Sequence, residues 1–296
     1  MNLTNRKKIC TPMKSDRLAK FAGNFMDTIA SCIKVAIQSR PCSIPLKKIE
    51  GNRSLVIMGN GPSLRATIDR DFDYLMEHDL MVVNFAANAP DFFRLRPHYY
   101  MLADGHFFNG ANRDPNVRKL WENLNNVSWE IAIFIPRRYR HFVAPLLMNA
   151  GKNISVGYFN LTPIEGFKKI NRLFFDAAMG MPRPRNVMIP AIMTGIRLGY
   201  KKIYLCGADH TWTKTLDVDS ENYVVTIQPH FYEDNEAEKK RVRETYKGIH
   251  LHDVLGSMSI AFRSYWEIAD YAQSKGVSII NATPQSMIDA FPRGDI

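Results

Sequence analysis

Two closely spaced glycines follow a short apolar run. Residues 55–58 are apolar, and directly after them come Gly59, Asn60, Gly61, Pro62 and Ser63. Glycine lets a backbone approach a phosphate closely, and ligands of open α/β sheets bind beyond the carboxyl ends of strands. No Lys-Ser/Thr pair follows, and Leu64 replaces the third glycine of a dinucleotide fingerprint. We expect a nucleotide-binding turn, with a tight structural turn as the alternative.

Polar residues also follow three other apolar runs. They are Asn84, Asp104 and Asp209, the last followed by His210. If the runs are parallel strands of one sheet, these residues converge on the same crevice as the glycine turn. Each alone is equally typical of an Asx-turn or a helix cap. Together they predict a binding site at one edge of a sheet.

The elements that position these residues alternate along the chain. Short apolar runs span 55–58, 80–84, 99–103, 131–135, 154–159, 203–206 and 277–280. Apolar residues at helical spacing lie between several of the runs, for example at Ile189, Ile192, Met193 and Ile196. Alternating strands and helices predict an α/β fold with a mostly parallel, Rossmann-like sheet.

Three sequence blocks resemble a known family. They read VIMGNGPSL over 56–64, LGYKKIYLCGAD over 198–209 and INATPQSMIDAFP over 280–292. They are similar to the bacterial sialyltransferases of glycosyltransferase family 42, and more distantly to the group of flagellin glycosyltransferases and pterin pyrophosphokinases. The resemblance implies a GT-A-variant fold, a CMP-activated nine-carbon sugar as donor, no essential metal and a surface glycan as acceptor.

The resemblance also implies roles for single residues. Residues 60–63 are similar to the turn that holds the CMP phosphate and ribose, Asn84 to a nucleotide-contacting asparagine, and Asp209 to the acidic residue of Gly-Ile-Asp. Asp104 stands where the family has a second asparagine, so its contact departs from the pattern.

Two further positions differ from the family. Thr211 replaces a tyrosine near the phosphate, and Tyr223 is the candidate substitute. The family's Arg-x-Thr-Ser reads Arg-Asn-Val-Met here, which keeps Arg185 and leaves Asn186 as a hydrogen-bond donor. These changes predict a donor or acceptor unlike that of the familiar sialyltransferases, such as a Kdo-like or pseudaminic-type acid on CMP, or another nucleotide sugar.

Sugar transfer to a hydroxyl needs a base, and histidine suits this work near neutral pH. The resemblance puts the base shortly before a helix, where His252 lies. His230 and His250 are the alternatives, and a lone histidine is more often structural than catalytic. The departing phosphate needs a positive group, for which Arg185 and the basic residues 239–241 are candidates.

A rival site uses a metal. Asp217 and Asp219 form a DxD, by which carboxylates can hold a cation that bridges phosphates. This motif arises often by chance and lies inside a polar segment, so we expect no metal and no cofactor. Asn281 and Ser286 follow the last apolar run and are expected at the crevice, with a turn and a capped final helix as the alternative.

Residues 1–50 differ from the rest. The basic run Arg6-Lys7-Lys8 precedes apolar residues at helical spacing, which are Leu18, Phe21, Phe25, Ile29, Ile33 and Ala36. They predict an amphipathic helix of about 20 residues. It packs on the main domain or a partner chain, or else residues 17–38 lie on an anionic membrane.

Bulk properties narrow the class of protein. The 296 residues carry a net charge of +10, which favours an anionic partner such as nucleotide phosphate or an acidic membrane surface over a merely solvated basic surface. Four cysteines without a CxxC pair favour a reducing compartment. No apolar run is long enough to span a membrane, and no nucleic-acid-binding module is recognisable.

We therefore predict a basic helical extension over 1–50 and a nucleotide-sugar-binding glycosyltransferase domain over 51–296, with a lid at about 210–257. The implied enzyme is cytoplasmic or peripheral to the inner membrane, and it moves a sialic-acid-like or Kdo-like residue from CMP to a glycan or glycolipid with inversion. The alternatives are a metal-dependent pyrophosphokinase-like transferase on a pterin, an NDP-sugar transferase using the DxD, and a non-catalytic binding protein. The sequence is also compatible with a homo-oligomer.

Overall fold

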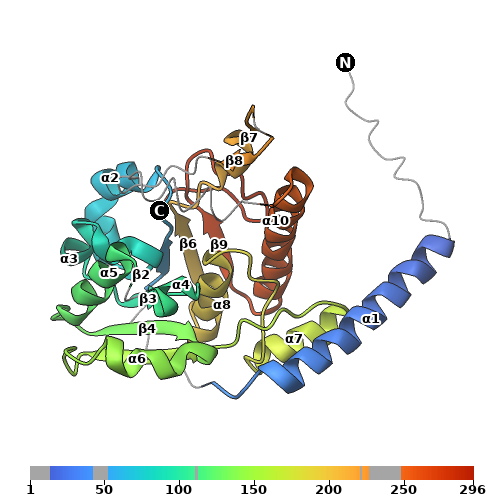
Figure 1. Cartoon of the computed structure of the whole chain (residues 1–296), viewed down its shortest axis with the longest axis horizontal. Helices are drawn as coiled ribbons and strands as arrows, with labels where there is room; N and C mark the ends of the chain where they lie inside the picture. Colours follow the sequence, from blue (N-terminus) through green and yellow to red (C-terminus); the bar gives the residue numbers. More distant parts are fainter. Residues whose placement is uncertain (1–13, 43–52, 111–112, 221, 227–247) are drawn as a thin grey trace.

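A computed structural model describes residues 14–42, 53–110, 113–220, 222–226 and 248–296. A seven-stranded sheet lies at the centre, with helices on both faces, and one long helix projects from the body (Figure 1). No helix among the described residues is long and apolar enough to cross a membrane.

The sheet confirms the predicted α/β fold. Its strands are β1 (Leu55–Met58), β2 (Asp79–Val83), β3 (Tyr99–Met101), β4 (Ile131–Pro136), β5 (Ile154–Phe159), β6 (Lys202–Cys206) and β9 (Ser278–Asn281). Their order is β5-β4-β3-β2-β1-β6-β9, and all neighbours are parallel. The chain runs outward from β1 to β5 and returns to β6 on the other side of β1. The direction of winding thus reverses between β1 and β6.

Helices bury both faces of the sheet, which is why its central strands are continuous apolar runs. One face packs against α8 (Met188–Leu198) and α10 (Leu251–Ser274). The other packs against α2 (Leu64–Met76), α3 (Asp91–Leu95) and α5 (Pro115–Asn125). The short helices α4 (His106–Asn109), α6 (Arg140–Leu146) and α7 (Lys168–Asp176) complete the body, with 3-10 turns at Asn84–Asn88, Arg137–Tyr139 and Thr211–Lys214.

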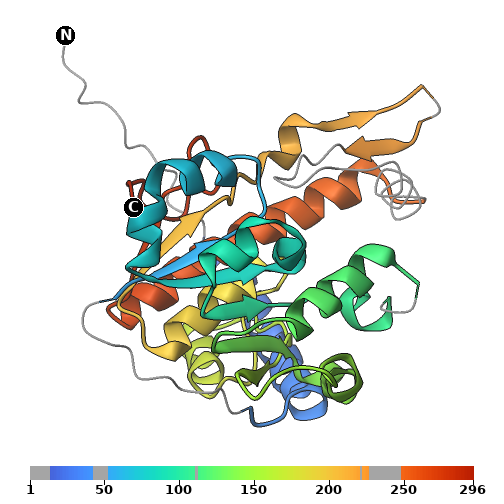
Figure 2. The same ribbon diagram turned by 90° about the vertical axis from the view of Figure 1, so that its left-hand side faces the viewer.

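The predicted lid region is only partly described. After β6 a small antiparallel hairpin, β7 (Leu216–Val218) and β8 (Val224–Thr226), extends away from the sheet (Figure 2). Residues 227–247 lie outside the described part of the chain. The role of this region as a lid stays a prediction.

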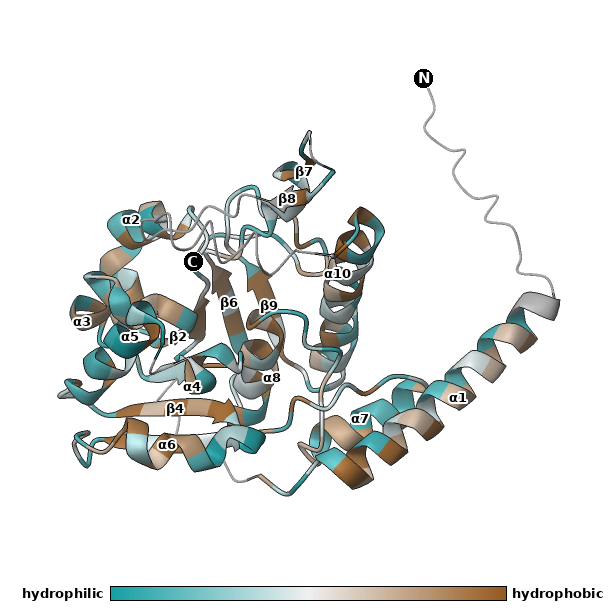
Figure 3. Cartoon of the chain, viewed as in Figure 1, coloured by the Kyte–Doolittle hydropathy of each residue, from teal (hydrophilic) through white to brown (hydrophobic). Residues whose placement is uncertain are grey.

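The N-terminal helix exists, but its contacts are not those that its apolar pattern indicates. Helix α1 (Lys14–Gln38) packs on the body through Thr28, Ser31 and Val35, which are buried. The apolar residues of the predicted face are exposed instead, and brown patches mark them along the helix in Figure 3. The final helix offered as an alternative after residue 283 does not form, because residues 282–296 contain no helix.

Candidate functional site

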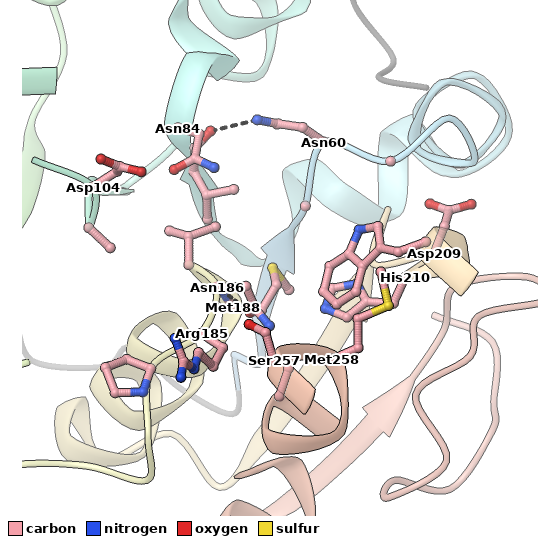
Figure 4. Close-up of a pocket in the computed structure, with 18 of the residues that line it drawn as sticks. Asn60, Asn84, Asp104, Arg185, Asn186, Met188, Asp209, His210, Ser257 and Met258 are labelled. Atoms are coloured by element: carbon pink, nitrogen blue, oxygen red, sulfur yellow. Dashed lines mark hydrogen bonds between the residues drawn. The ribbon is translucent and has the colours of Figure 1, made fainter. Parts of the chain in front are cut away.

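A cavity of about 1010 Å³ opens at the carboxyl ends of the strands (Figure 4). Its wall comes from the segments after the six strands β1 to β6, the segment before α8, and the first turns of α10. The reversal between β1 and β6 lies at its floor. Open α/β sheets bind ligands at this place, because the connections on either side diverge and leave a crevice.

The glycines of the turn after β1 serve contacts within the protein. A methyl group on Gly59 would lie 2.5 Å from the carbonyl oxygen of Gly207, and one on Gly61 would lie 1.9 Å from Asp209 Oδ2. The Gly59 and Gly61 N–H groups donate to Cys206 and Gly207, each at 2.8 Å. The bare backbone thus lets the loops after β1 and β6 pack together. This is the tight structural turn of the alternative, and the nucleotide role stays a prediction.

Asp209 holds this turn from the opposite loop. The Ser63 hydroxyl donates to Asp209 Oδ2 at 2.8 Å, and the Ser63 backbone also contributes a hydrogen bond. Burial raises the pKa of Asp209 despite these bonds. Two predicted nucleotide contacts, Ser63 and Asp209, are therefore partners of each other, and Asp209 also lines the cavity.

Asn60 brings a polar side chain of the turn to the cavity. Its Nδ2 donates to the Val83 carbonyl at 3.1 Å, which orients the amide (Figure 4). Its buried Oδ1 has no hydrogen-bond partner among the described residues. Asn84 has a left-handed backbone, with φ of 50°, and lines the cavity beside it. Asp104 lines the same wall, and its Oδ1 accepts the His106 N–H at 2.8 Å.

Asn186 contributes from the loop before α8. Its Oδ1 accepts two hydrogen bonds, from the Met188 N–H at 3.0 Å and from the Tyr265 hydroxyl at 2.9 Å. These bonds fix the orientation of the amide. The buried Nδ2 then has no partner among the residues that the structure describes. Two buried amide atoms of the cavity wall, the acceptor Oδ1 of Asn60 and the donor Nδ2 of Asn186, thus have no partner within the described ranges.

His210 was expected at the crevice beside Asp209, but the sequence assigned no role to it. It lines the cavity and is 8% exposed, and its ring packs against that of Trp212, with the centroids 4.1 Å apart and the ring planes tilted by 31°. Its Nε2 lies 2.6 Å from the Tyr265 hydroxyl. Burial lowers the pKa of His210 to about 3, so the ring is neutral. Tyr265 lies on α10, and nothing in its sequence pattern distinguished it from other core residues.

The cavity has cationic and anionic walls. Arg138 and Arg185 line it, and both are exposed to solvent. Asp104, Asp209 and Asp253 also line it. The basic residues 239–241 lie outside the described part of the chain. Within the part described, the two arginines are the cationic side chains at the cavity.

Two of the predicted bases, His250 and His252, lie at the start of α10. His252, in the first turn of α10, has an 80% exposed side chain and an Nε2 that lies 3.3 Å from Asp253 Oδ1. It is not among the described residues that line the cavity, whereas its neighbour Asp253 is. The His250 side chain caps α10 by accepting the Asp253 N–H, and the two imidazoles stack at 5.8 Å. His230 lies outside the described residues.

Four further predicted residues have structural partners. Asn281 donates to the Ile288 carbonyl at 3.1 Å, and Ser286 donates to the Ala208 carbonyl at 2.6 Å. Both are buried; the Asn281 bond lies within the C-terminal segment, and the Ser286 bond ties that segment to the loop after β6. Asp219 accepts the Tyr223 N–H at 2.9 Å in the hairpin. None of the four is among the described residues lining the cavity, so the structure does not bring them to this site.

The rival metal site is not assembled in the described part of the chain. Asp217 Oδ1 accepts the Val218 N–H at 2.8 Å, on the hairpin away from the cavity lining. Among the described residues, no group of three or more His, Cys, Asp and Glu side chains could hold a metal ion.

Among known proteins, the likenesses found are to solved structures. No protein-family model matches the chain, and no curated protein matches it. Among solved structures, the MAf glycosyltransferase from Magnetospirillum magneticum AMB-1 is similar, with a TM-score of 0.49 and 12% identity. The match covers 93% of this chain and 38% of that one, so this chain spans well under half of that protein. Membership in glycosyltransferase family 42 stays a prediction.

Proposed function

We propose that the chain is a glycosyltransferase that moves a sialic-acid-like or Kdo-like sugar from CMP to a bacterial surface glycan or glycolipid. The observation that carries the proposal is a pair of buried amide atoms in the cavity wall, Asn60 Oδ1 and Asn186 Nδ2. Neither atom has a hydrogen-bond partner among the described residues. Buried polar atoms are normally paired, so a ligand with hydroxyl or amino groups is expected to pair them. The three sequence blocks support the choice of a CMP sugar.

The proposal assigns the leaving phosphate to arginines. The Gly59, Gly61 and Ser63 N–H groups already donate to the end of β6 and the loop after it, and Pro62 has no N–H, so the turn has few donors left for an anion. Arg138 follows β4 and Arg185 precedes α8, and both line the cavity. In a metal-free mechanism their charge stabilises the CMP phosphate as it departs. Asn60 and Asn84 are then assigned to the nucleoside.

In this mechanism the acceptor hydroxyl oxygen attacks the anomeric carbon while the bond from that carbon to the CMP phosphate breaks. CMP leaves with the electron pair, and the hydroxyl proton passes to a base. His252 is the proposed base, because it adjoins Asp253 at the cavity edge and is freely exposed. One direct displacement inverts the anomeric configuration.

Thermal unfolding tests the ligand class. The protein is heated with CMP, CDP, UDP, GDP or ATP, each in EDTA or with Mn²⁺. A ligand at 100 times its Kd adds about 2.7 kcal/mol to the free energy of unfolding. Stabilisation by CMP in EDTA is expected. Stabilisation only by a diphosphate or by ATP, and only with metal, would overturn the CMP proposal and favour the DxD or the pterin alternative.

A further inference from the structure

Seven large apolar side chains form an exposed stripe along α1, which we call the α1 stripe. Its residues are Leu18, Phe21, Phe25, Met26, Ile29, Ile33 and Ile37. Their exposure ranges from 41% at Ile29 to 71% at Leu18. Of the seven, Phe21 also contacts the body, because its ring centroid lies 5.3 Å from that of Phe167. Apart from the adjacent pair Phe25 and Met26, steps of three and four residues separate the seven side chains, which places them on one side of the helix. Contiguous apolar patches of this kind are rare on free surfaces and mark sites of interaction.

Polar contacts hold the other side of α1 to the body. Ser31 Oγ donates to the Glu165 carbonyl and accepts the Glu165 N–H, both at 2.9 Å. Thr28 Oγ1 accepts the Phe167 N–H at 3.0 Å. Gly166, with φ of +117°, allows this approach, because a methyl group there would lie 2.1 Å from Thr28 Oγ1. The helix therefore cannot roll to bury the stripe without breaking these bonds.

The C-terminal end of α1 is fixed as well. Ser39 Oγ bonds to Thr162 Oγ1 at 2.7 Å, and Asn160 Nδ2 donates to the Arg40 carbonyl at 2.8 Å. Val35 is 8% exposed and belongs to the main core. The N-terminal half of α1 projects beyond the body (Figure 1). The fold thus holds the helix by its small and polar side and directs its apolar side outward.

Charge indicates what covers the stripe. Residues 17–38 contain three basic side chains and one acidic one, and Arg6-Lys7-Lys8 precedes them in a chain of net charge +10. Arg17 and Lys20 are exposed on α1, as is Lys169 on the neighbouring α7. A second copy would bring like charges together, whereas an anionic lipid surface complements them. A basic helix with Phe, Leu and Ile on its other side is typical of the membrane interface.

We propose that the α1 stripe inserts into the interface of a membrane rich in anionic lipid, with α1 lying in the membrane plane. The bonds around Thr28 and Ser31 then fix the orientation of the body on that surface. This inference rests on α1 and its contacts, and it holds or fails independently of the proposed transferase activity.

Vesicle flotation tests it with the full chain and no substrate. The probes are phosphatidylcholine vesicles with and without about one third phosphatidylglycerol. We expect binding to the anionic vesicles that weakens with salt, and little binding to the neutral ones. Ile33→Glu should weaken binding at least about tenfold, since it removes an inserted side chain and adds a charge. Gln38→Glu makes the same charge change at an exposed position outside the stripe and should bind almost as wild type.

Light scattering at several protein concentrations tests whether a second copy of the chain covers the α1 stripe instead of a membrane. Both variants should keep the wild-type unfolding temperature, because both positions are exposed. Equal loss of binding in the two variants, or no preference for anionic vesicles, would overturn the proposal. A wild-type dimer that Ile33→Glu converts to a monomer would assign the stripe to a second copy and would overturn it too.

Discussion

His210 donates its Nε2–H to the hydroxyl oxygen of Tyr265, across 2.6 Å in the wall of the cavity. The direction follows from the next bond. Asn186 Oδ1 accepts the Met188 N–H, so this atom is the carbonyl oxygen and the single Tyr265 proton must go to it. Nε2 of His210 must then carry a proton. In the neutral ring the lone pair therefore lies on Nδ1.

Without the Tyr265 hydroxyl, no hydrogen bond from this residue should hold His210 in the Nε2–H tautomer. We expect Tyr265→Phe to give a mixture of Nε2–H and Nδ1–H forms at His210, and to cost about 1–3 kcal/mol of unfolding free energy for the lost buried hydrogen bonds. Heteronuclear NMR on protein with isotopically labelled histidine measures the tautomer, with His210→Gln to assign the signal.

Tyr271→Phe is the matched control, because Tyr271 is also buried on α10 and donates to Asp176 at 2.8 Å, outside the cavity lining. It should cost stability but leave the His210 tautomer unchanged. If His210 of Tyr265→Phe stayed entirely in the Nε2–H form, the tautomer would not depend on the Tyr265 hydroxyl, which would contradict the prediction.

His210 should make the stability of the protein depend on pH. Burial lowers its pKa to about 3, from an ordinary value of 6.5. Between these values the unfolded state binds the extra proton, so the stabilising contribution is complete above pH 6.5 and declines as the pH falls toward 3. This one group contributes a slope of up to about 1.4 kcal/mol per pH unit.

Denaturant unfolding at several pH values measures this dependence. The free energy of unfolding should change less with pH in His210→Gln than in wild type. His252→Gln, at an exposed position, should follow wild type, and equal slopes in all three proteins would refute the assignment.

The sequence predicted the fold more fully than the site, for a physical reason. Runs such as 55–58 and 131–135 are apolar on both faces, which only a doubly covered parallel sheet satisfies. Position after a strand identifies a candidate residue but not the direction of its side chain. Asn60 and Asn84 line the cavity, whereas Asn281 turns into the C-terminal segment.

Contacts between distant parts of the chain were beyond the sequence pattern. His210 and Tyr265 are 55 residues apart, and no local signal links them. Periodicity likewise identified the apolar side of α1, but it could not tell what covers that side. The small and polar residues Thr28 and Ser31, which make the contacts with the body, give no apolar signal.

Gly61→Ala should destabilise the protein whether or not a nucleotide binds. The new methyl group would lie 1.9 Å from Asp209 Oδ2 and 2.7 Å from the Gly207 carbonyl, so the two loops must move apart. Such overpacking costs about 1–3 kcal/mol, which denaturant unfolding measures directly. Gly256→Ala, with no atom within 4 Å of the added group on α10, should instead stabilise by about 0.5–1 kcal/mol. An unchanged free energy of unfolding in Gly61→Ala would show that the loops after β1 and β6 are loosely packed.

His252→Ala tests the proposed base. Release of CMP from a CMP-linked nonulosonic acid should slow roughly 10²–10⁴-fold in kcat, with KM little changed, because the base acts on the attacking hydroxyl. His141, an exposed histidine of α6, provides the matched control, and His141→Ala should keep the wild-type rate. A wild-type kcat in His252→Ala would move the role to another residue.

Asn60→Ala should weaken CMP binding with little effect on the free protein. The side chain makes one internal hydrogen bond, to the Val83 carbonyl, and its Oδ1 is unpartnered among the described residues. Loss of a ligand bond to this atom is expected to raise the Kd roughly 5–30-fold, which corresponds to about 1–2 kcal/mol. Isothermal titration with CMP measures the change.

Asn88→Ala is the matched control. It removes a comparable amide, which bonds to the Asn116 carbonyl at 2.9 Å outside the cavity lining, and the variant should bind CMP with the Kd of wild type. Equal weakening in both variants would indicate a general structural effect, and unchanged binding in Asn60→Ala would show that the ligand bonds elsewhere in the cavity.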